Sequence, residues 1–380
     1  MITALGVSNN RLRGVVAQSH PRPVRFVELD ALSPLLPDSV ALLARAQAEA
    51  VRGPCQPWLA VEVAATWQTG SFDRWMCAAL VDERVVGAAS VVAFHHGNSH
   101  LADVEIVVAP SHRRRGIGRE LWTRAADAVR AHGADTVVGA VGEPVEADAA
   151  WRHHAAAVLD PELTVRIAAG DPVGLAFAAG IGAEQVQTEF LSRLDVPAAT
   201  PAVEAMLAPL DAEVARHAGD YVVTTHLGLP PAQLRAGIAR LAARMYTDPP
   251  IGQLDLRPDE VSVDRLEADA ATNHAAGQVA VCTLAVHRTS REVAAMSDVL
   301  FRADEPLWGE QHDTIVDPAH RGHRLGFAVK AAGLRRLLAE HPSVRHVQTY
   351  NALENGPMLA VNRAMGFEPV SMFAICQRKL

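Results

Sequence analysis

The feature that most constrains the fold is a sequence pattern that occurs twice. The segment "VAPSHRRRGIG" at residues 108–118 aligns with "VDPAHRGHRLG" at residues 316–326, an offset of 208 residues. Glu105 and Asp313 fall on the same position of the two copies. An internal repeat of this length indicates duplicated domains rather than a solenoid. The 380 residues of the chain are enough for two ordinary domains.

Both halves predict the same order of elements around this pattern. In the first half, apolar β-type runs at residues 76–81 and 85–94 flank a polar turn, and runs at residues 278–286 and 293–301 repeat this hairpin in the second half. A strand, the glycine-containing loop, a helix and another strand then follow in each half. We therefore expect an α/β (α+β) fold in which each half is a mixed, mainly antiparallel β-sheet flanked by helices.

A run of small residues and prolines, "DVPAATPA" at residues 195–202, separates the two halves and suits a linker. We expect an N-terminal tail at residues 1–20 and an N-terminal domain at residues 21–195. A linker at residues 196–202 and a C-terminal domain at residues 203–380 follow.

The composition excludes several classes of protein. Hydrophobic residues make up 49% and charged residues 21% of the chain, which is typical of a globular protein. The formal net charge of −8 argues against nucleic-acid binding and suits a cationic acceptor. No apolar run reaches the roughly 18 residues of a membrane helix, and the start of the chain lacks the apolar core of a signal peptide. We therefore expect a cytoplasmic protein without membrane contact.

The cysteines do not form a metal-binding or disulfide pattern. They are far apart in the sequence and include no CxxC pair. We expect buried, reduced thiols and no metal. The four cysteines are Cys55, Cys77, Cys282 and Cys376.

The loop of the first copy has the composition of an anion site. A helix N-terminus exposes unpaired N–H groups, glycine lets the backbone approach a phosphate, and arginine adds bidentate donors. The spacing is Arg-x-x-Gly-x-Gly, formed by Arg113, Gly116 and Gly118. It is neither a Walker A motif nor GxGxxG. The alternative is a solvated basic turn without a ligand.

The segment "VVAPSHRRRGIGRELW" at residues 107–122 resembles motif A of the GNAT superfamily of acyl-CoA-dependent N-acyltransferases. In that family the loop cradles the pyrophosphate of acetyl-CoA, and the preceding strand pairs with the pantetheine. The resemblance covers the hairpin, motif A and the next strand in both halves. It implies two tandem GNAT-like domains, in a layout similar to tandem GNAT enzymes such as mycothiol synthase.

The resemblance also implies which residues bind the cofactor, acetyl-CoA, with no metal. The second copy adds the segment "YNALENGPMLAVNRAMGF", which resembles the last conserved segment of the family. In the first copy the implied residues are Val107, Val108, Arg113, Arg114, Arg115, Gly116, Ile117, Gly118 and Arg119. In the second copy they are Val316, Arg321, Gly322, His323, Arg324, Leu325, Gly326, Asn351 and Asn355.

The second copy departs from the family because Arg324 stands where the first glycine belongs. Its backbone N–H can still face a phosphate, and we expect a conformation that does not demand a positive φ. Both pyrophosphate binding and a purely structural role for the second loop remain open.

Catalysis needs a base for the attacking amine, donors for the oxyanion and an acid for the leaving thiolate. In the family the base is often a carboxylate near the central strand, which implies Glu105 and Asp313; a structural role is the alternative. The positions of the family's acidic tyrosine hold Ala178 and Asn362. Tyr350 ends the strand that should flank the cofactor gap of the second copy, and it is the remaining candidate for the acid. The alternative is a role in the hydrophobic core.

The resulting expectation is an N-acetyltransferase that moves an acetyl group from acetyl-CoA to the amine of a small molecule. The protein would be a monomer or a homodimer. The alternatives are a non-catalytic acyl-CoA sensor or scaffold, and a protein N-acetyltransferase. We expect the first copy to bind acyl-CoA at least as well as the second. For catalysis we lean slightly to the second copy, because Asp313, Tyr350 and Asn355 gather there.

Overall fold

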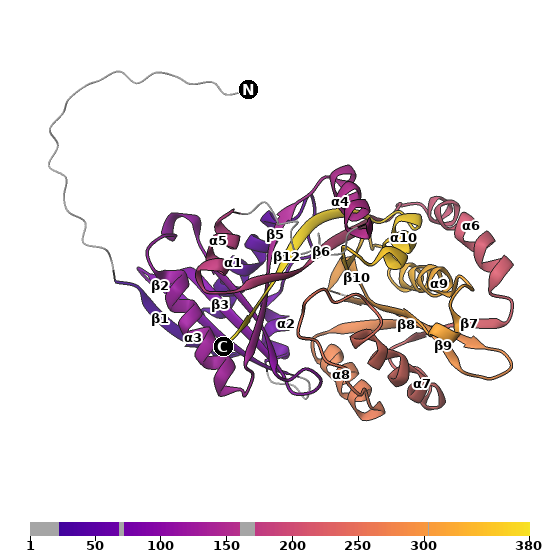
Figure 1. Ribbon diagram of the computed structural model, residues 1–380, viewed down its shortest axis with the longest axis horizontal. Coiled ribbons are helices and arrows are strands. Elements are labelled where there is room, and N and C mark those ends of the chain that lie inside the picture. Colours follow the sequence, from indigo (N-terminus) through magenta and orange to yellow (C-terminus); the bar gives the residue numbers. More distant parts are fainter. Residues whose placement is uncertain (1–22, 68–71, 160–171, 303) are drawn as a thin grey trace, which may run out of the picture.

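Strands from both halves of the chain join into one sheet. The computed structural model describes residues 23–67, 72–159, 172–302 and 304–380. Within these residues the strands form a 12-stranded sheet in the order β1-β2-β3-β4-β5-β12-β6-β11-β10-β9-β8-β7. Figure 1 shows the two halves as two lobes along this sheet.

The strand bounds follow the predicted hairpins and central strands closely. The first half contains β1 (Arg25–Leu29), β2 (Phe72–Val81), β3 (Arg84–Phe94), β4 (Leu101–Val108), β5 (Thr136–Pro144) and β6 (Glu184–Asp195). The second half contains β7 (Tyr221–Leu227), β8 (Gln278–His287), β9 (Val293–Arg302), β10 (Glu305–Val316), β11 (His346–Ala352) and β12 (Glu368–Lys379).

Helices cover both faces of the sheet. Those of the first half are α1 (Leu36–Glu49), α2 (Ala60–Ala65), α3 (Ile117–Ala131), α4 (Ala147–Leu159) and α5 (Pro172–Gly180). Those of the second half are α6 (Thr200–His217), α7 (Ala232–Ala243), α8 (Val263–Ala275), α9 (Leu325–Glu340) and α10 (Gly356–Ala364). Because β6 ends at Asp195 and α6 begins at Thr200, the end of the predicted linker is helical.

The two predicted copies occupy equivalent places. β4 ends at Val108 and β10 at Val316, and α3 begins at Ile117 where α9 begins at Leu325. All four positions keep the offset of 208 residues. The pattern in the sequence is therefore a pattern in the structure, with a loop between the central strand and a long helix in each half.

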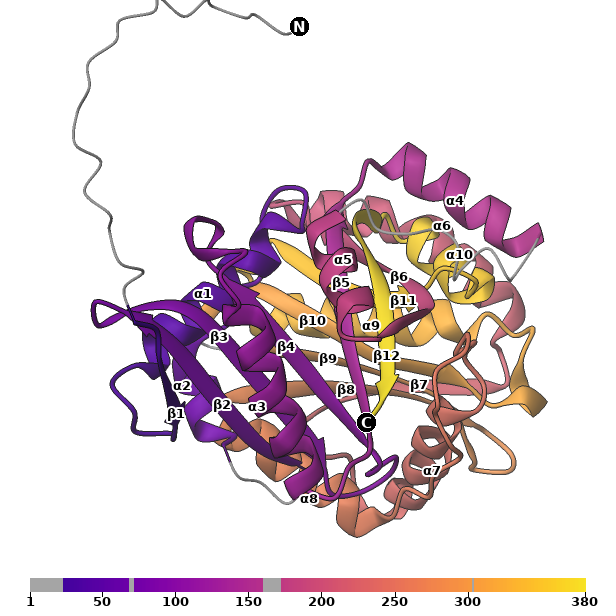
Figure 2. The same cartoon turned by 60° about the vertical axis from the view of Figure 1, so that its left-hand side comes forward.

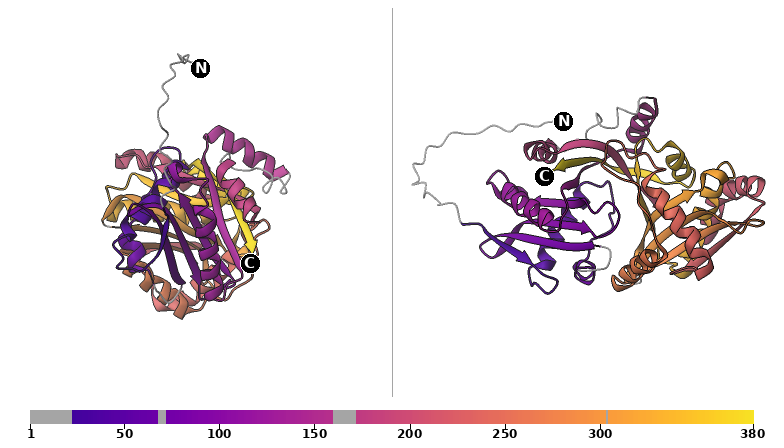
Figure 3. Two further views of the ribbon diagram at one scale, coloured as in Figure 1. Left: turned by 90° about the vertical axis from the view of Figure 1, so that its left-hand side faces the viewer. Right: turned by 60° about the horizontal axis from the view of Figure 1, so that its bottom comes forward.

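The last strand of each half lies next to the other half. β12 pairs antiparallel with β5 on one edge and with β6 on the other, while β6 also pairs with β11. Figures 1 and 2 show β12, in yellow, running between β5 and β6, and the views in Figure 3 show its end in the first lobe. The sequence predicts a sheet for each half; the structure joins them by this exchange.

Alternation along β2 explains why helices pack on both faces of the first half. Met76, Ala78 and Leu80 face α1, whereas the intervening residues face α3. β2 is therefore buried on both faces, and its sequence reads as a continuous apolar run rather than an alternating one.

The central strand and the next strand diverge in both halves, which opens a gap in the sheet. β4 pairs with β5 over three residues only, ending at Asp103 opposite Val138. β10 pairs with β11 over three residues, ending at Glu310 opposite Gln348. The edge of β4 from residue 104 to residue 108 thus has no β5 partner in this register.

The strand exchange should make the two halves unfold together. We expect deletion of residues 368–380 to abolish cooperative unfolding of the first half, because β12 fills the place between β5 and β6. Five of the six tryptophans belong to the first half, so a Trp308→Phe variant reports that half by fluorescence. In the Trp308→Phe variant with β12 intact, the midpoint of thermal unfolding measured by tryptophan fluorescence should coincide with the midpoint measured by circular dichroism. Separate midpoints, or an unchanged first half after the deletion, would contradict this account.

Candidate functional site

A cavity of about 1290 Å³ opens where β4 and β5 diverge. Its walls come from α1, β4, the loop before α3, α5 and β5. The second half completes it with Tyr350 of β11 and with residues of β12, namely Phe373, Ile375, Cys376 and Arg378. The site is therefore built from both halves of the chain.

The loop of the first copy forms a cradle at one end of this cavity. Arg114 has a φ of 62° and Gly116, directly before α3, a φ of 85°. These left-handed residues turn successive backbone N–H groups toward one side, and the first turn of α3 adds its own unpaired N–H groups. A Cβ atom placed on Gly116 would meet nothing within 4 Å, so the cradle is open.

The arginines of this loop keep part of their guanidinium N–H groups available for a ligand. The Nε atom of Arg113 donates to the carbonyl oxygen of Val108 at 3.0 Å, and Nη2 of Arg115 donates to that of Ser111 at 3.0 Å. Arg114 and Arg119 are exposed. In the described part of the chain, none of these four arginines forms an ion pair with a carboxylate. The cradle thus carries uncompensated positive charge at a helix N-terminus, which suits a phosphate.

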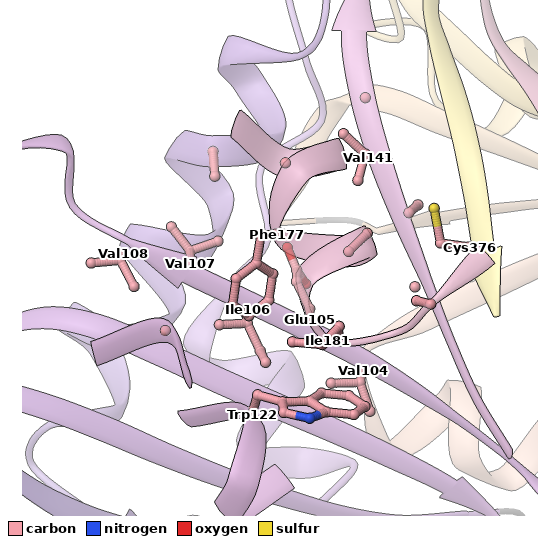
Figure 4. Close-up of a pocket in the computed structure, with 18 of the residues that line it drawn as sticks. Val104, Glu105, Ile106, Val107, Val108, Trp122, Val141, Phe177, Ile181 and Cys376 are labelled. Atoms are coloured by element: carbon pink, nitrogen blue, oxygen red, sulfur yellow. The ribbon is translucent and has the colours of Figure 1, made fainter. Parts of the chain in front are cut away.

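β4 presents different chemistry on its two faces. Ile106 and Val108 pack on the α3 side, and Figure 4 shows Ile106 beside Phe177 and near Trp122. Val107 packs against α1 on the opposite side, and alternation places Glu105 on that side as well. An extended ligand in the gap would meet the free edge of β4 and end near Glu105.

Two carboxylates of β4 line the cavity. Burial raises the pKa of Glu105 to about 7, although Arg74 opposes this. Burial likewise raises the pKa of Asp103 to about 6, again opposed by Arg74. Arg74 reaches across from β2, and its Nη1 donates to the hydroxyl of Ser90 at 3.1 Å. A carboxyl group with a pKa near 7 is matched to proton transfer at neutral pH.

Glu189 of β6 and Tyr350 of β11 stand where the two halves meet. Burial, Glu354 and Asp103 raise the pKa of Glu189 to about 7. The Tyr350 side chain is 37% exposed, and its hydroxyl accepts from Nε2 of Gln47 at 3.5 Å. Burial among protein groups and the nearby Glu310 raise its pKa, so the phenol stays protonated at neutral pH.

The sequence predicts Tyr350 beside the gap of the second half, and the structure places it at both cavities. Sequence analysis missed Arg74 and Glu189 as site residues. Glu189 reaches the first cavity because β6 pairs with the second half's last two strands, and no local pattern signals that pairing.

The second copy has a smaller cavity, of about 410 Å³. Asp313, Asn351 and Asn355 line it, whereas the loop from Arg321 to Gly326 does not. Burial raises the pKa of Asp313. Asn355 caps α10, because its Oδ1 accepts from the backbone N–H of Met358 at 3.3 Å. The second cavity is therefore lined by only some of the residues that the resemblance assigns to one cofactor site.

Carboxylates of the second half engage the arginines of the second loop. Nη2 of Arg321 lies 2.5 Å from Oδ2 of Asp248, and Nε of Arg324 lies 3.5 Å from Oε2 of Glu213. Val316, at the end of β10, accepts from Nε of Arg321 at 3.3 Å. Carboxylates therefore compensate the positive charge of the second loop, whereas the arginines of the first loop have no carboxylate partner among the described residues.

The backbone of the second loop repeats that of the first with glycine and arginine exchanged. Gly322 has a φ of 88° and Arg324 a φ of 57°, at the places of Arg114 and Gly116. The expectation that Arg324 avoids positive φ is therefore wrong. The turn before α9 requires a left-handed residue there, at a cost of about 1–2 kcal/mol for arginine.

A buried chain of hydrogen bonds links α9, α10 and β11 beside the second cavity. Nζ of Lys330, on α9, donates to Oδ1 of Asn362 on α10 at 2.6 Å, and Nδ2 of Asn362 donates to Oδ1 of Asn351 on β11 at 2.6 Å. Lys330 is 1% exposed, and burial lowers its pKa to about 7. In the first copy Trp122 holds the place of Lys330 and lines the open cavity. The chain ties the two helices and the strand together in the second copy.

Comparisons with known proteins agree with this architecture. The model of the acetyltransferase (GNAT) family matches residues 42–154, and no protein of curated function matches the chain. A tandem GNAT protein from the clavulanic acid biosynthesis pathway is 25% identical, with a TM-score of 0.69, over 94% of this chain and 98% of that one. A GCN5-related N-acetyltransferase from Sphaerobacter thermophilus is 15% identical, with a TM-score of 0.61, over 94% and 97%.

The described residues show neither a membrane-spanning helix nor a metal-binding cluster. They contain no helix that is both long and apolar enough to span a membrane. They also contain no group of three or more His, Cys, Asp or Glu side chains arranged to hold a metal ion.

Proposed function

Because this chain belongs to the GNAT superfamily of acyltransferases and has two GNAT-like domains, we propose that it transfers an acetyl group from acetyl-CoA to the amine of a small molecule, at one centre in its first half. The observation that carries this proposal is the open arginine-glycine cradle, which leads through the gap beside β4 to the Glu105 carboxylate. The predicted monomer or homodimer and the cytoplasmic location stay predictions.

The cradle and the gap position the donor. The loop N–H groups, Arg113 and Arg114 bind the pyrophosphate, and the free edge of β4 aligns the pantetheine. The thioester then lies at the far end of this free edge, near Glu105, where a backbone N–H of β4 faces the carbonyl oxygen as it gains negative charge. The shape of the gap thus fixes one reactant against the strand.

Glu105 receives the proton of the attacking amine, directly or through a water molecule. The amine nitrogen forms a bond to the thioester carbon, the carbon–sulfur bond breaks, and coenzyme A leaves as a thiolate. The phenol of Tyr350, which stays protonated, supplies a proton to the sulfur. Neither Ala178 nor Asn362, at the family's tyrosine positions, has an acidic group for this step.

The second half completes the first site and does not form a second one. Arg321 and Arg324 are in ion pairs, and Lys330, which lines the second cavity, is hydrogen-bonded to Asn362 of α10. Meanwhile Tyr350 and β12 wall the first cavity. These contacts support catalysis in the first half and reverse the slight lean toward the second copy.

The test of the function is release of free thiol from acetyl-CoA in the presence of a panel of small amines, amino acids and peptides. We expect acceptor-dependent release with small amines. A non-catalytic sensor would bind acetyl-CoA in calorimetry and release no thiol with any member of the panel. A protein N-acetyltransferase would instead prefer the peptides.

Replacement of Tyr350 by phenylalanine should lower kcat about tenfold. The effect is modest for an acid catalyst because coenzyme A thiolate is a tolerable leaving group. The KM for acetyl-CoA should stay within about twofold, since the described contact of the phenol is with Gln47 of α1. The check is steady-state kinetics beside Tyr246→Phe, a matched change outside the lining of the cavity. An unchanged kcat in Tyr350→Phe would remove the acid role.

A further inference from the structure

Charge in the first cavity is divided between its two ends. At the end formed by the loop and α3, the described lining contains basic side chains. On the α1 side of β4 it contains the carboxylates of Asp103, Glu105 and Glu189. The basic side chains at the first end are those of His112, Arg113, Arg114, Arg119 and Arg378.

Arg74 is the one cation in the described lining on the carboxylate side, and it does not neutralise that side. Its Nη1 donates to Ser90, and its Nε is buried without a hydrogen-bond partner in the described structure. Burial raises the pKa of Asp103 to about 6 and of both glutamates to about 7. Ionised together, three carboxylates outnumber one guanidinium, so a bound cation would stabilise them.

On the α1 side, the cavity also contains a hydrogen-bond acceptor that lacks a donor. The side-chain oxygen Oε1 of Gln47, on α1, is buried and finds no hydrogen-bond partner in the described residues. The rings of Trp58, Tyr350 and Phe373 line the cavity as well. Hydrogen-bond acceptors without donors, together with aromatic faces, match an ammonium group.

The positions of the carboxylates separate their tasks. Glu105 lies farther along β4 toward the cradle than Asp103, and therefore nearer the thioester of the proposed reaction. Asp103 and Glu189 both line the cavity although they come from β4 and β6. Glu105 can serve the reacting nitrogen while the other pair holds a second charge.

We infer that the acceptor is an amine with at least one further positive charge, which Asp103 and Glu189 hold while Glu105 serves the reacting amino group. The inference rests on the proposed function and deepens it, because it assigns the acceptor to the class of linear or cyclic diamines and polyamines. Glu189 thereby becomes a specificity residue that the second half of the sheet holds in place.

The experiment is calorimetric binding to the full chain saturated with coenzyme A, which needs no turnover. The probes are 1,3-diaminopropane, 1,4-diaminobutane and 1,5-diaminopentane, each against the amino alcohol of equal length. We expect at least one diamine to bind about tenfold or more tightly than its amino alcohol, because a charge-assisted contact is gained. Equal affinities throughout the series would overturn the inference.

Glu189→Gln tests the assigned residue, with Glu184→Gln at the exposed end of the same strand as its control. We expect Glu189→Gln to bring the affinity ratio of diamine to amino alcohol to about one, and Glu184→Gln to leave it unchanged. Coenzyme A affinity and the melting temperature show that both variants are folded. A ratio that survives in Glu189→Gln would overturn the assignment.

Failure of the inference differs from failure of the proposed function. If monoamines and diamines release thiol with equal efficiency, acyl transfer is supported, and the inference that the acceptor carries a second positive charge is wrong. If diamines bind selectively but no amine causes thiol release, the binding site for a doubly charged amine is supported, and the proposed acyl transfer is wrong.

Discussion

Replacement of Glu105 by glutamine should lower kcat by about 100-fold or more and leave the affinity for coenzyme A nearly unchanged. The carboxylate is the base in the proposed reaction, and general bases contribute on the order of 10²- to 10⁴-fold. Glutamine keeps the size of the side chain and removes its proton affinity. The measurement is thiol release under saturating acetyl-CoA, once an acceptor has been identified.

The pH dependence gives the same residue a second test. The base works in its ionised form, and burial raises the pKa of Glu105 to about 7. kcat/KM should therefore increase as the pH rises through about 7, and it should be low at pH values below about 7. Asp313→Asn is the matched control, because Asp313 holds the equivalent place on β10, outside the first cavity. Full activity in Glu105→Gln, or loss in Asp313→Asn alone, would contradict the assignment.

Replacement of Gly116 by aspartate should reduce the affinity for coenzyme A by about 100-fold or more. Aspartate would place a carboxylate against the pyrophosphate and narrow the cradle, which is open at this glycine. The left-handed φ of 85° adds about 1–2 kcal/mol of backbone strain. Calorimetry of the full chain measures the affinity.

Gly322→Asp in the second loop is a close control. Gly322 also has a left-handed φ, of 88°, and a Cβ atom there would also meet nothing within 4 Å. The two substitutions therefore cost similar strain, and only the first touches the proposed ligand. Equal losses of coenzyme A affinity in both variants would refute the division of labour between the loops.

Much of the fold could be predicted because the evidence for it is local. The apolar runs of the hairpins gave β2, β3, β8 and β9, and the offset of 208 residues gave two equivalent loops before α3 and α9. Spacing of arginine and glycine alone indicated the cradle at Arg113 and Gly116. The structure finds that loop at the mouth of the gap beside β4.

The rest of the site could not be predicted because it depends on pairing between distant strands. Neither β6 nor β12 carries a signal that each will lie beside the other half's fifth strand. Glu189 and Tyr350 reach the first cavity only through that exchange. Local spacing therefore predicted Tyr350 beside the second gap only and gave no reason to select Glu189.

The second loop resembles the motif in sequence, but the motif does not predict the side chains that contact it. Its residues resemble the motif, yet their partners come from segments that no motif marks, Asp248 and Glu213. Lys330 and Asn362 likewise look like ordinary helix residues until α9 and α10 pack together. Whether a copied loop stays open depends on such tertiary contacts.

The measurement that tests the account most directly is the number of coenzyme A molecules bound per chain in a calorimetric titration of the full protein. One open cradle and one ion-paired loop predict a single site, lost in Gly116→Asp and kept in Gly322→Asp. Two sites of similar affinity, or one site that survives Gly116→Asp, would contradict a single acyl-CoA centre in the first half.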